Sequence, residues 1–264
     1  MSPTAGHTHQ PRTAKPHSNA PIVLQADNVA PQAWRNGGGQ TRELLVWPAA
    51  SAGAANANPA GGASSAAPWQ LRISRADIDA SGPFSAFPGV QRWFVVLSGK
   101  GVVLHMPTPD GHTLDHVLLP GHTPLHFDGA LAPGCTLVDG STQDLNLMVR
   151  AGTACMLPVE PARAWRADFA QCGLYTACNG IWSDGQQTLA LEAHTLLWLE
   201  QGNQSPMCFT PTDSAGTAVL AVPSIASTNT LEAATGTTSA ACGSTHKATP
   251  NSAWWLDFTP ETTA

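Results

Sequence analysis

The chain has 264 residues, of which 42% are hydrophobic and 11% are charged, and its formal net charge is −6. This negative balance, without any run of lysine or arginine, argues against nucleic acid and an anionic membrane as partners. The 24 glycines and 22 prolines interrupt the chain too often for long helices, which favours short strands joined by turns. At this length, one large β unit and two small ones are both possible.

The N-terminal residues set the expected location of the protein. Residues 1–20 are polar and proline-rich, so they predict a disordered tail and contain no apolar segment typical of a signal peptide. Nowhere do about 18 apolar residues run together, as a membrane-spanning helix requires. The six cysteines include no C-x-x-C pair and are too dilute for a disulfide scaffold. We therefore expect a cytoplasmic protein with free thiols.

Two segments are too poor in large side chains to contribute to a core. Residues 49–67 contain no charge and no aliphatic side chain larger than alanine, and residues 224–252 are similar. Both predict flexible insertions. The free energy of closing a loop grows only logarithmically with its length, so a sturdy β core tolerates both.

Alternating hydrophobicity predicts the strands. In residues 69–76 the side chains Trp69, Leu71 and Ile73 share one face, and residues 143–151 repeat this pattern. Residues 92–106 are apolar on both faces and interrupted by Ser-Gly-Lys-Gly, which predicts a hairpin in the middle of a sheet. Later strands are expected at 195–200, 216–222 and 253–258, and a short helix near 161–170. The pattern predicts an all-β sandwich or barrel.

The histidines do not have the spacing of a metal site. The two pairs His112/His116 and His122/His126 are four residues apart, but nearby glycines and prolines argue against the helix that this spacing needs. On a strand, four residues span about 13 Å, too far for one metal ion. We therefore predict no metal and no other cofactor. We expect these four histidines and His105 to be surface or loop residues.

Six of the nine arginines lie between residues 35 and 150. Arg72 and Arg150 share strand faces with polar neighbours, so each face lies either in water or in a polar pocket. In the second case we expect Arg42, Arg72 and Arg150 to converge on one hollow, where the planar guanidinium suits a carboxylate ligand. The pair Asp77/Asp79 has acid–base spacing, but turn or edge carboxylates explain it more simply.

Several motifs together resemble the HutD/Ves family. They are W-x-N-G-G-G-x-T-R-E-L from Trp34, G-P-F-S-x-F-P-G-x-x-R from Gly82, and D-L-N-x-M from Asp144. The resemblance implies a cupin-type β-barrel, that is, an RmlC-like jelly roll, in a bicupin arrangement. One unit would then cover residues 21–264, with its halves at about 21–130 and 131–264.

The run Gly37, Gly38 and Gly39 has two possible roles, in ligand binding or in a turn. Without Cβ atoms, their amides can approach a ligand closely. A bulge or corner before the next strand also requires glycine, so both readings stay open. In the segment from Gly82 to Arg92, the phenylalanines can similarly be core residues or part of a cavity wall.

The resemblance further implies a protein associated with histidine utilisation that binds a small acidic metabolite, such as N-formylglutamate, without turnover. It implies no metal, and a homodimer is one allowed assembly. Glu43 and Asp144 are expected to hold arginines in place. The alternatives are a metal-free hydrolase or isomerase that uses Glu43 or Asp144 as a base, and a stress-response protein without a small ligand. The predicted site comprises Trp34, Asn36, Gly37, Gly38, Gly39, Thr41, Arg42, Glu43, Arg72, Ser74, Ser85, Phe87, Arg92, Asp144, Asn146 and Arg150.

Overall fold

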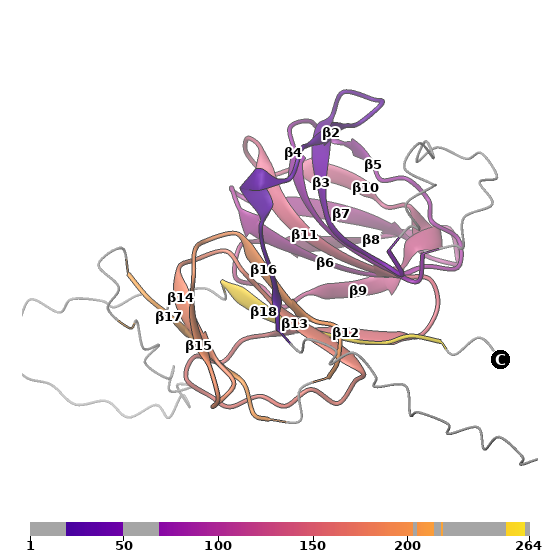
Figure 1. Ribbon diagram of the computed structural model, residues 1–264. Coiled ribbons are helices and arrows are strands. Elements are labelled where there is room, and N and C mark those ends of the chain that lie inside the picture. Colours follow the sequence, from indigo (N-terminus) through magenta and orange to yellow (C-terminus); the bar gives the residue numbers. More distant parts are fainter. Residues whose placement is uncertain (1–19, 50–68, 203–204, 214–217, 219–251, 262–264) are drawn as a thin grey trace, which may run out of the picture.

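The computed structural model describes residues 20–49, 69–202, 205–213, 218 and 252–261 (Figure 1). The predicted tail, the two predicted insertions and the expected strand at 216–222 lie outside these residues, apart from a single residue of each. Within the described part, no helix is long and apolar enough to cross a membrane.

The described strands form four antiparallel sheets, with two short 3₁₀ turns and no α-helix. Sheet I contains, in spatial order, β2 (Gln32–Ala33), β3 (Gly39–Trp47), β4 (Leu71–Ile78), β11 (Thr142–Val149), β6 (Gln91–Ser98) and β9 (Leu125–Asp128). Sheet II contains β5 (Gly82–Pro83), β10 (Gly134–Leu137), β7 (Val102–Pro107) and β8 (Thr113–Leu118). These two sheets enclose one apolar core, to which Phe94 and Leu104 belong.

The other two sheets follow later in the chain. Sheet III contains β1 (Ile22–Gln25), β16 (Thr195–Leu199), β13 (Gln171–Thr176), β18 (Ala253–Thr259) and β12 (Thr153–Pro158). Sheet IV contains β15 (Thr188–Leu191), β14 (Gly180–Ser183) and β17 (Cys208–Pro211). Their shared core includes Trp182 and Trp255. The all-β prediction is confirmed.

A third core joins the two pairs of sheets. Leu71, Ile73, Leu145 and Leu147 of sheet I pack with Trp198 and other side chains of sheet III. All five of these residues are fully buried. The predicted aliphatic stripes of β4 and β11 therefore cover sheet III. Because side chains alternate along a strand, the polar residues between them face sheet II. The layers follow in the order II, I, III and IV (Figure 1).

The predicted hairpin at 92–106 is wrong. Both strands form, but β6 belongs to sheet I and β7 to sheet II. The intervening turn is a corner between facing sheets. Gly101 has a φ of +100°, and a Cβ atom there would lie 2.4 Å from the carbonyl oxygen of Leu118. The glycine lets the chain turn tightly against β8 instead of folding back onto β6.

The predicted helix near 161–170 is also wrong. Trp165 lies in an isolated β-bridge with Met207, and its ring stacks on that of Trp255 with 4.7 Å between centroids. Burial of this aromatic pair holds the segment in an extended conformation, so tertiary packing overrides the weak local signal from Pro161.

The chain passes from one pair of sheets to the other near residue 150, whereas the sequence suggested a division near 130. The reason is β11, which completes sheet I between β4 and β6. The N-terminal strand β1 also departs from that division, because it pairs with β16 at the edge of sheet III. Strands that are neighbours in the sequence therefore belong to different pairs of sheets, depending on which apolar core their apolar face covers.

Candidate ligand-binding pocket

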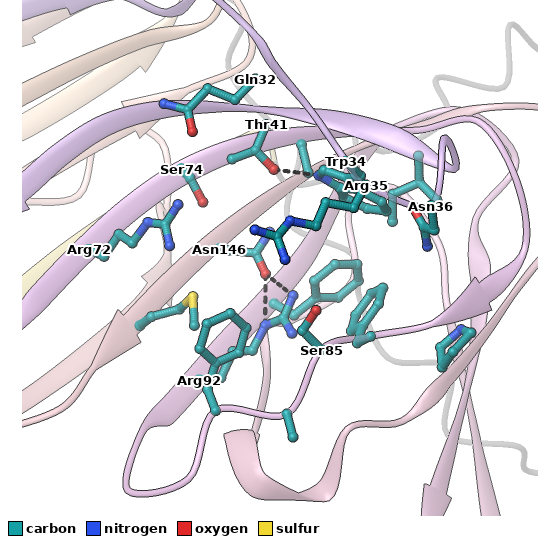
Figure 2. A pocket seen from close by; sticks show the side chains of 18 of the residues that line it. Gln32, Trp34, Arg35, Asn36, Thr41, Arg72, Ser74, Ser85, Arg92 and Asn146 are labelled. Carbon is teal, nitrogen blue, oxygen red and sulfur yellow. Dashed lines mark hydrogen bonds between the residues drawn. The ribbon is translucent and has the colours of Figure 1, made fainter. Parts of the chain in front are cut away.

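A cavity of about 520 Å³ opens on the face of sheet I that points toward sheet II (Figure 2). Its volume lies within the range of about 300–1,000 Å³ that is typical of small-molecule sites. The walls come from β2 and the β2–β3 turn, from strands β3, β4, β6 and β11, and from β5 and the segment after it. The lining residues are Gln32, Ala33, Trp34, Arg35, Asn36, Thr41, Arg72, Ser74, Ala76, Ile78, Pro83, Phe84, Ser85, Ala86, Phe87, Arg92, Phe94, Asn146 and Met148.

Strand register places two arginines on opposite sides of one methionine. Met148 of β11 pairs with Arg72 of β4 on one side and with Arg92 of β6 on the other. Neighbouring strands are about 4.8 Å apart, so the backbones of the two arginines are about 10 Å apart. The next row toward the middle of the sheet contains Ser74, Asn146 and Phe94. The pocket floor is therefore an ordered grid of cationic, polar and apolar groups.

Arg92 is a nearly buried cation, with only 8% of its surface exposed. Its Nε and Nη2 donate to Asn146 Oδ1 at 2.9 and 2.5 Å, and its guanidinium lies 4.4 Å from the ring centroid of Phe84. Burial lowers the pKa of Arg92 to about 10, although the carboxyl of Asp144 opposes this shift. The side chain stays charged at neutral pH. Within the described residues, no carboxylate lies within ion-pair distance of it.

The other two pocket arginines differ in their surroundings. Arg72 is half-buried, and its Nε lies 2.7 Å from Glu43 Oε2, a charge contact without good hydrogen-bond alignment. Arg35 lies exposed on the β2–β3 turn and has no ion pair with the described part of the chain. Figure 2 shows both side chains extending from separate elements toward the space above Asn146. Three guanidinium groups thus line the cavity, and Glu43, which contacts Arg72, does not line it.

Asp144 lies one row beyond Asn146 and is completely buried. Its Oδ2 accepts a hydrogen bond from the Thr142 hydroxyl at 2.9 Å, while its Oδ1 has no hydrogen-bond partner among the described residues. Burial raises the pKa of Asp144 to about 8, because an ionised carboxylate is poorly solvated there. At neutral pH this carboxyl is mostly protonated and contributes little negative charge to the pocket.

The three consecutive glycines form the turn that carries Trp34, Arg35 and Asn36. Gly37 has a φ of +70°, in the left-handed region. A Cβ atom on Gly39 would lie 2.3 Å from the carbonyl oxygen of Asp77, so only glycine lets β3 begin this close to β4. None of the three lines the cavity. Their geometry supports the interpretation that they form a turn. They position the side chains of the cavity wall but do not line the cavity themselves.

Many of the predicted site residues line this one cavity. They are Trp34, Asn36, Thr41, Arg72, Ser74, Ser85, Phe87, Arg92 and Asn146. The predicted residues that do not line it are Gly37, Gly38, Gly39, Arg42, Glu43, Asp144 and Arg150. Glu43 holds Arg72, as expected, whereas Asp144 makes no ion pair within the described part of the chain.

The expected convergence of Arg42, Arg72 and Arg150 is wrong for two of the three. Arg42 follows Thr41 and therefore points to the opposite face of β3, where its Nη1 lies 2.7 Å from Asp77 Oδ2. Arg150 lies just beyond β11, exposed, with its guanidinium 4.7 Å from the ring centroid of Trp69. Strand alternation separates the first from the pocket, and the end of the strand separates the second.

Sequence reasoning missed several lining residues that the same alternation predicts. Ala76 and Ile78 follow Ser74 at steps of two, and Met148 follows Asn146. Arg35 lies between the two predicted residues Trp34 and Asn36. Because Arg35 lies in a turn, the two-residue alternation of a strand does not predict the direction of its side chain. Only the structure places it at the cavity.

None of the described histidines lies in a group of three or more His, Cys, Asp or Glu side chains arranged to hold a metal ion. His105 is engaged at both ring nitrogens, with Asp115 at 2.7 Å and Thr136 at 2.8 Å. Its contacts join β7 to β8 and β10 on sheet II, away from the pocket.

Comparison with known proteins connects this chain to a family. The family model described as HutD matches residues 26–215. Protein Ves from Citrobacter koseri is 31% identical over 161 residues, which cover 60% of this chain and 73% of that protein.

Solved structures share the fold. A conserved protein of unknown function from Pseudomonas aeruginosa has 28% identity and a TM-score of 0.58, and the match covers 72% of this chain and 92% of that one. HutD from Pseudomonas fluorescens SBW25 has 19% identity and a TM-score of 0.63, with 92% and 100% covered. The solved neighbours are of the cupin type. The extent of the family match, over most of the described strands and every pocket element, shows that the chain belongs to the HutD family.

Proposed function

We propose that this protein binds a small acidic metabolite in the pocket on sheet I and acts as a sensing or regulatory protein in histidine degradation, with N-formylglutamate as its ligand. The observation that carries the proposal is Arg92. The residue is only 8% exposed, it lines a cavity, and its guanidinium lacks a carboxylate partner within the described residues, so an anion in the cavity would offset its desolvation.

The distance between the arginines favours a dicarboxylate. Arg72 and Arg92 lie on either side of Met148, with backbones about 10 Å apart and side chains long enough to reach inward. A glutarate skeleton, as in N-formylglutamate, can present one carboxylate to each guanidinium. Each pair gains from the match between a planar fork and a carboxylate. Ser74 and Asn146 lie between the two and can bond the central part of the ligand.

The positions of the carboxyl groups favour binding over catalysis. Of the two proposed general bases, Glu43 contacts Arg72 and Asp144 is sealed behind the pocket, and neither lines the cavity. A general base must lie within hydrogen-bond reach of the proton that it removes. The described walls supply arginines, amides and hydroxyls, which suit recognition of an anion.

We also infer that the two pairs of sheets correspond to the two halves of a bicupin. Sheets I and II surround one core, sheets III and IV surround another, and a third core joins them. The described pocket belongs to the first half only.

Calorimetric titration with N-formyl-L-glutamate tests the function. Arg72→Ala should weaken binding by about 2–5 kcal/mol, because it removes one partner of a partly desolvated charge pair. Arg42→Ala is the matched control, since Arg42 also forms a 2.7 Å ion pair on an adjacent strand but faces away from the cavity. Equal affinity of the Arg72→Ala variant and the wild type would reject the proposed site. Loss of the formyl signal in an NMR time course would favour the hydrolase.

A further inference from the structure

Three polar side chains of the pocket, Asn36, Thr41 and Asn146, use acceptor atoms in hydrogen bonds within the protein and keep donor groups free. The clearest case is Asn146. Arginine has only donors, so the amide oxygen must face Arg92, from which it accepts both hydrogen bonds. The Nδ2 group therefore points away from Arg92, toward the space above the β4 side of the strand (Figure 2).

Two further residues repeat this arrangement. Asn36 Oδ1 accepts the backbone N–H of Gly38 at 3.0 Å, which leaves its Nδ2 as the outward group. Thr41 Oγ1 accepts from Trp34 Nε1 at 2.8 Å, so its hydroxyl hydrogen is available to donate. In each case a hydrogen bond within the protein fixes the side-chain orientation before any ligand binds.

The charged groups have a single sign. The lining residues include Arg35, Arg72 and Arg92 but neither Asp nor Glu. The nearest carboxylates are Glu43, whose Oε2 contacts Arg72, and the sealed Asp144. A cationic group in the cavity would meet three guanidiniums and the N–H groups of two oriented amides. Like charges in such a site disfavour binding, and this disfavoured contact is itself a source of specificity.

We propose that the pocket selects acidic ligands that carry no positively charged group and rejects those that carry an ammonium group, with Asn146 as the specificity-determining residue. The inference rests on the proposed function and narrows its ligand class. It predicts that a dicarboxylate or an N-acylated acidic amino acid binds, whereas the corresponding free amino acid is excluded.

Glutarate and L-glutamate form the matched pair of probes. They have the same two carboxylates on the same carbon chain and differ only in the α-ammonium group. In calorimetric titrations of the full chain at one pH and salt concentration, glutarate and N-formyl-L-glutamate should bind. L-glutamate should bind at least about 30-fold more weakly than glutarate, owing to repulsion by the guanidiniums.

The variant Asn146→Asp tests the residue. A carboxylate still accepts from Arg92, but it replaces the inward amide donor with a negatively charged acceptor. Glutarate should bind at least about tenfold more weakly, and the preference for glutarate over glutamate should shrink by a similar factor. Gln143→Glu adds the same charge to β11 on its opposite face, where Gln143 accepts from Ser98 Oγ, and should leave the preference unchanged.

The outcomes separate the two proposals. Equal affinity for glutarate and glutamate in the wild type would overturn the inference and leave the binding function intact. Failure of glutarate and N-formylglutamate alike to bind would overturn the binding function itself. An unchanged preference in a folded Asn146→Asp variant would overturn the role assigned to Asn146.

Discussion

Asp144 shows how burial decides the chemistry of a residue whose type suggests a different role. An aspartate beside an arginine is expected to form an ion pair, yet Asp144 has no ion-pair partner in the described chain and one of its oxygens lacks a hydrogen bond. Burial raises its pKa to about 8 against an ordinary value of 3.8. The native state thus binds a proton that the unfolded state releases at lower pH, so Asp144 destabilises the fold as pH rises.

The variant Asp144→Asn should therefore be more stable than the wild type at neutral pH. The contribution of the protonated Asp144 to the free energy of unfolding of the wild type is fully present below pH 3.8, and it is lost progressively as pH rises toward about 8. Asn keeps an acceptor for the Thr142 hydroxyl and cannot ionise. Between pH 5 and pH 8 the stability difference should grow by at least about 1.4 kcal/mol, the equivalent of one pKa unit.

Urea denaturation at several pH values measures this difference. Asp79→Asn is the control, because Asp79 is an exposed aspartate just beyond β4. A stability difference between Asp144→Asn and the wild type that stays constant from pH 5 to pH 8 would contradict the assignment.

At the scale of elements, the β2–β3 turn positions the part of the pocket wall formed by Trp34, Arg35 and Asn36. Trp34 N–H donates to the Gly39 carbonyl at 2.9 Å, and the backbone N–H groups of Asp79 and Ala80 both donate to the Gly38 carbonyl. The turn is therefore bonded to the end of β4, and its side chains have a defined direction. The fixed positions of Arg35 and Asn36 at the cavity depend on these backbone hydrogen bonds.

Gly39→Ala should destabilise the protein by about 1–3 kcal/mol, because the new methyl group overlaps the carbonyl oxygen of Asp77 and the backbone must move. Gly82→Ala is a matched control with no atom within 4 Å of the added Cβ and should have a much smaller effect. Guanidinium denaturation compares the two variants. A Gly39→Ala protein as stable as Gly82→Ala would show that β3 does not need the close approach.

At the scale of the whole molecule, the apolar junction between sheets I and III joins the two halves into one structure. Leu147 on one side and Trp198 on the other are fully buried in it. A polar group interrupts the junction, where Arg75, 2% exposed, lies 2.7 Å from Asp27, and the Tyr175 hydroxyl lies 3.2 Å from His194 Nδ1. Because Asp27 follows β1 of sheet III, this ion pair also bridges the halves.

The two halves should therefore unfold together. Leu147→Ala in the junction should lower stability by about 2–5 kcal/mol and shift a single transition. Leu104→Ala lies in the core of sheets I and II alone and should shift the same transition. Scanning calorimetry tests both variants. Two separate transitions, with Leu104→Ala moving only one, would show that the halves unfold independently.

The sequence by itself determined the local structure and much of the pocket. Alternation located β4 and β11 and separated an aliphatic face from a polar face on each, and the strands expected at 195–200 and 253–258 correspond to β16 and β18. The motifs placed Trp34, Arg92 and Asn146 in the predicted site and the polar strand face added Arg72, and these four residues line one cavity. Such features depend on residues close together in the chain, which a period of two and the turn residues report directly.

Only the tertiary structure decided which faces meet and which arginines converge. Period two shows that Thr41 and Arg42 point to opposite faces, but it does not show which face borders the cavity. The corner at Gly101 sends β7 to a different sheet from β6, and β11 joins strands that lie far apart in sequence. These choices depend on the burial of apolar faces from distant segments, a nonlocal free energy that no local pattern contains.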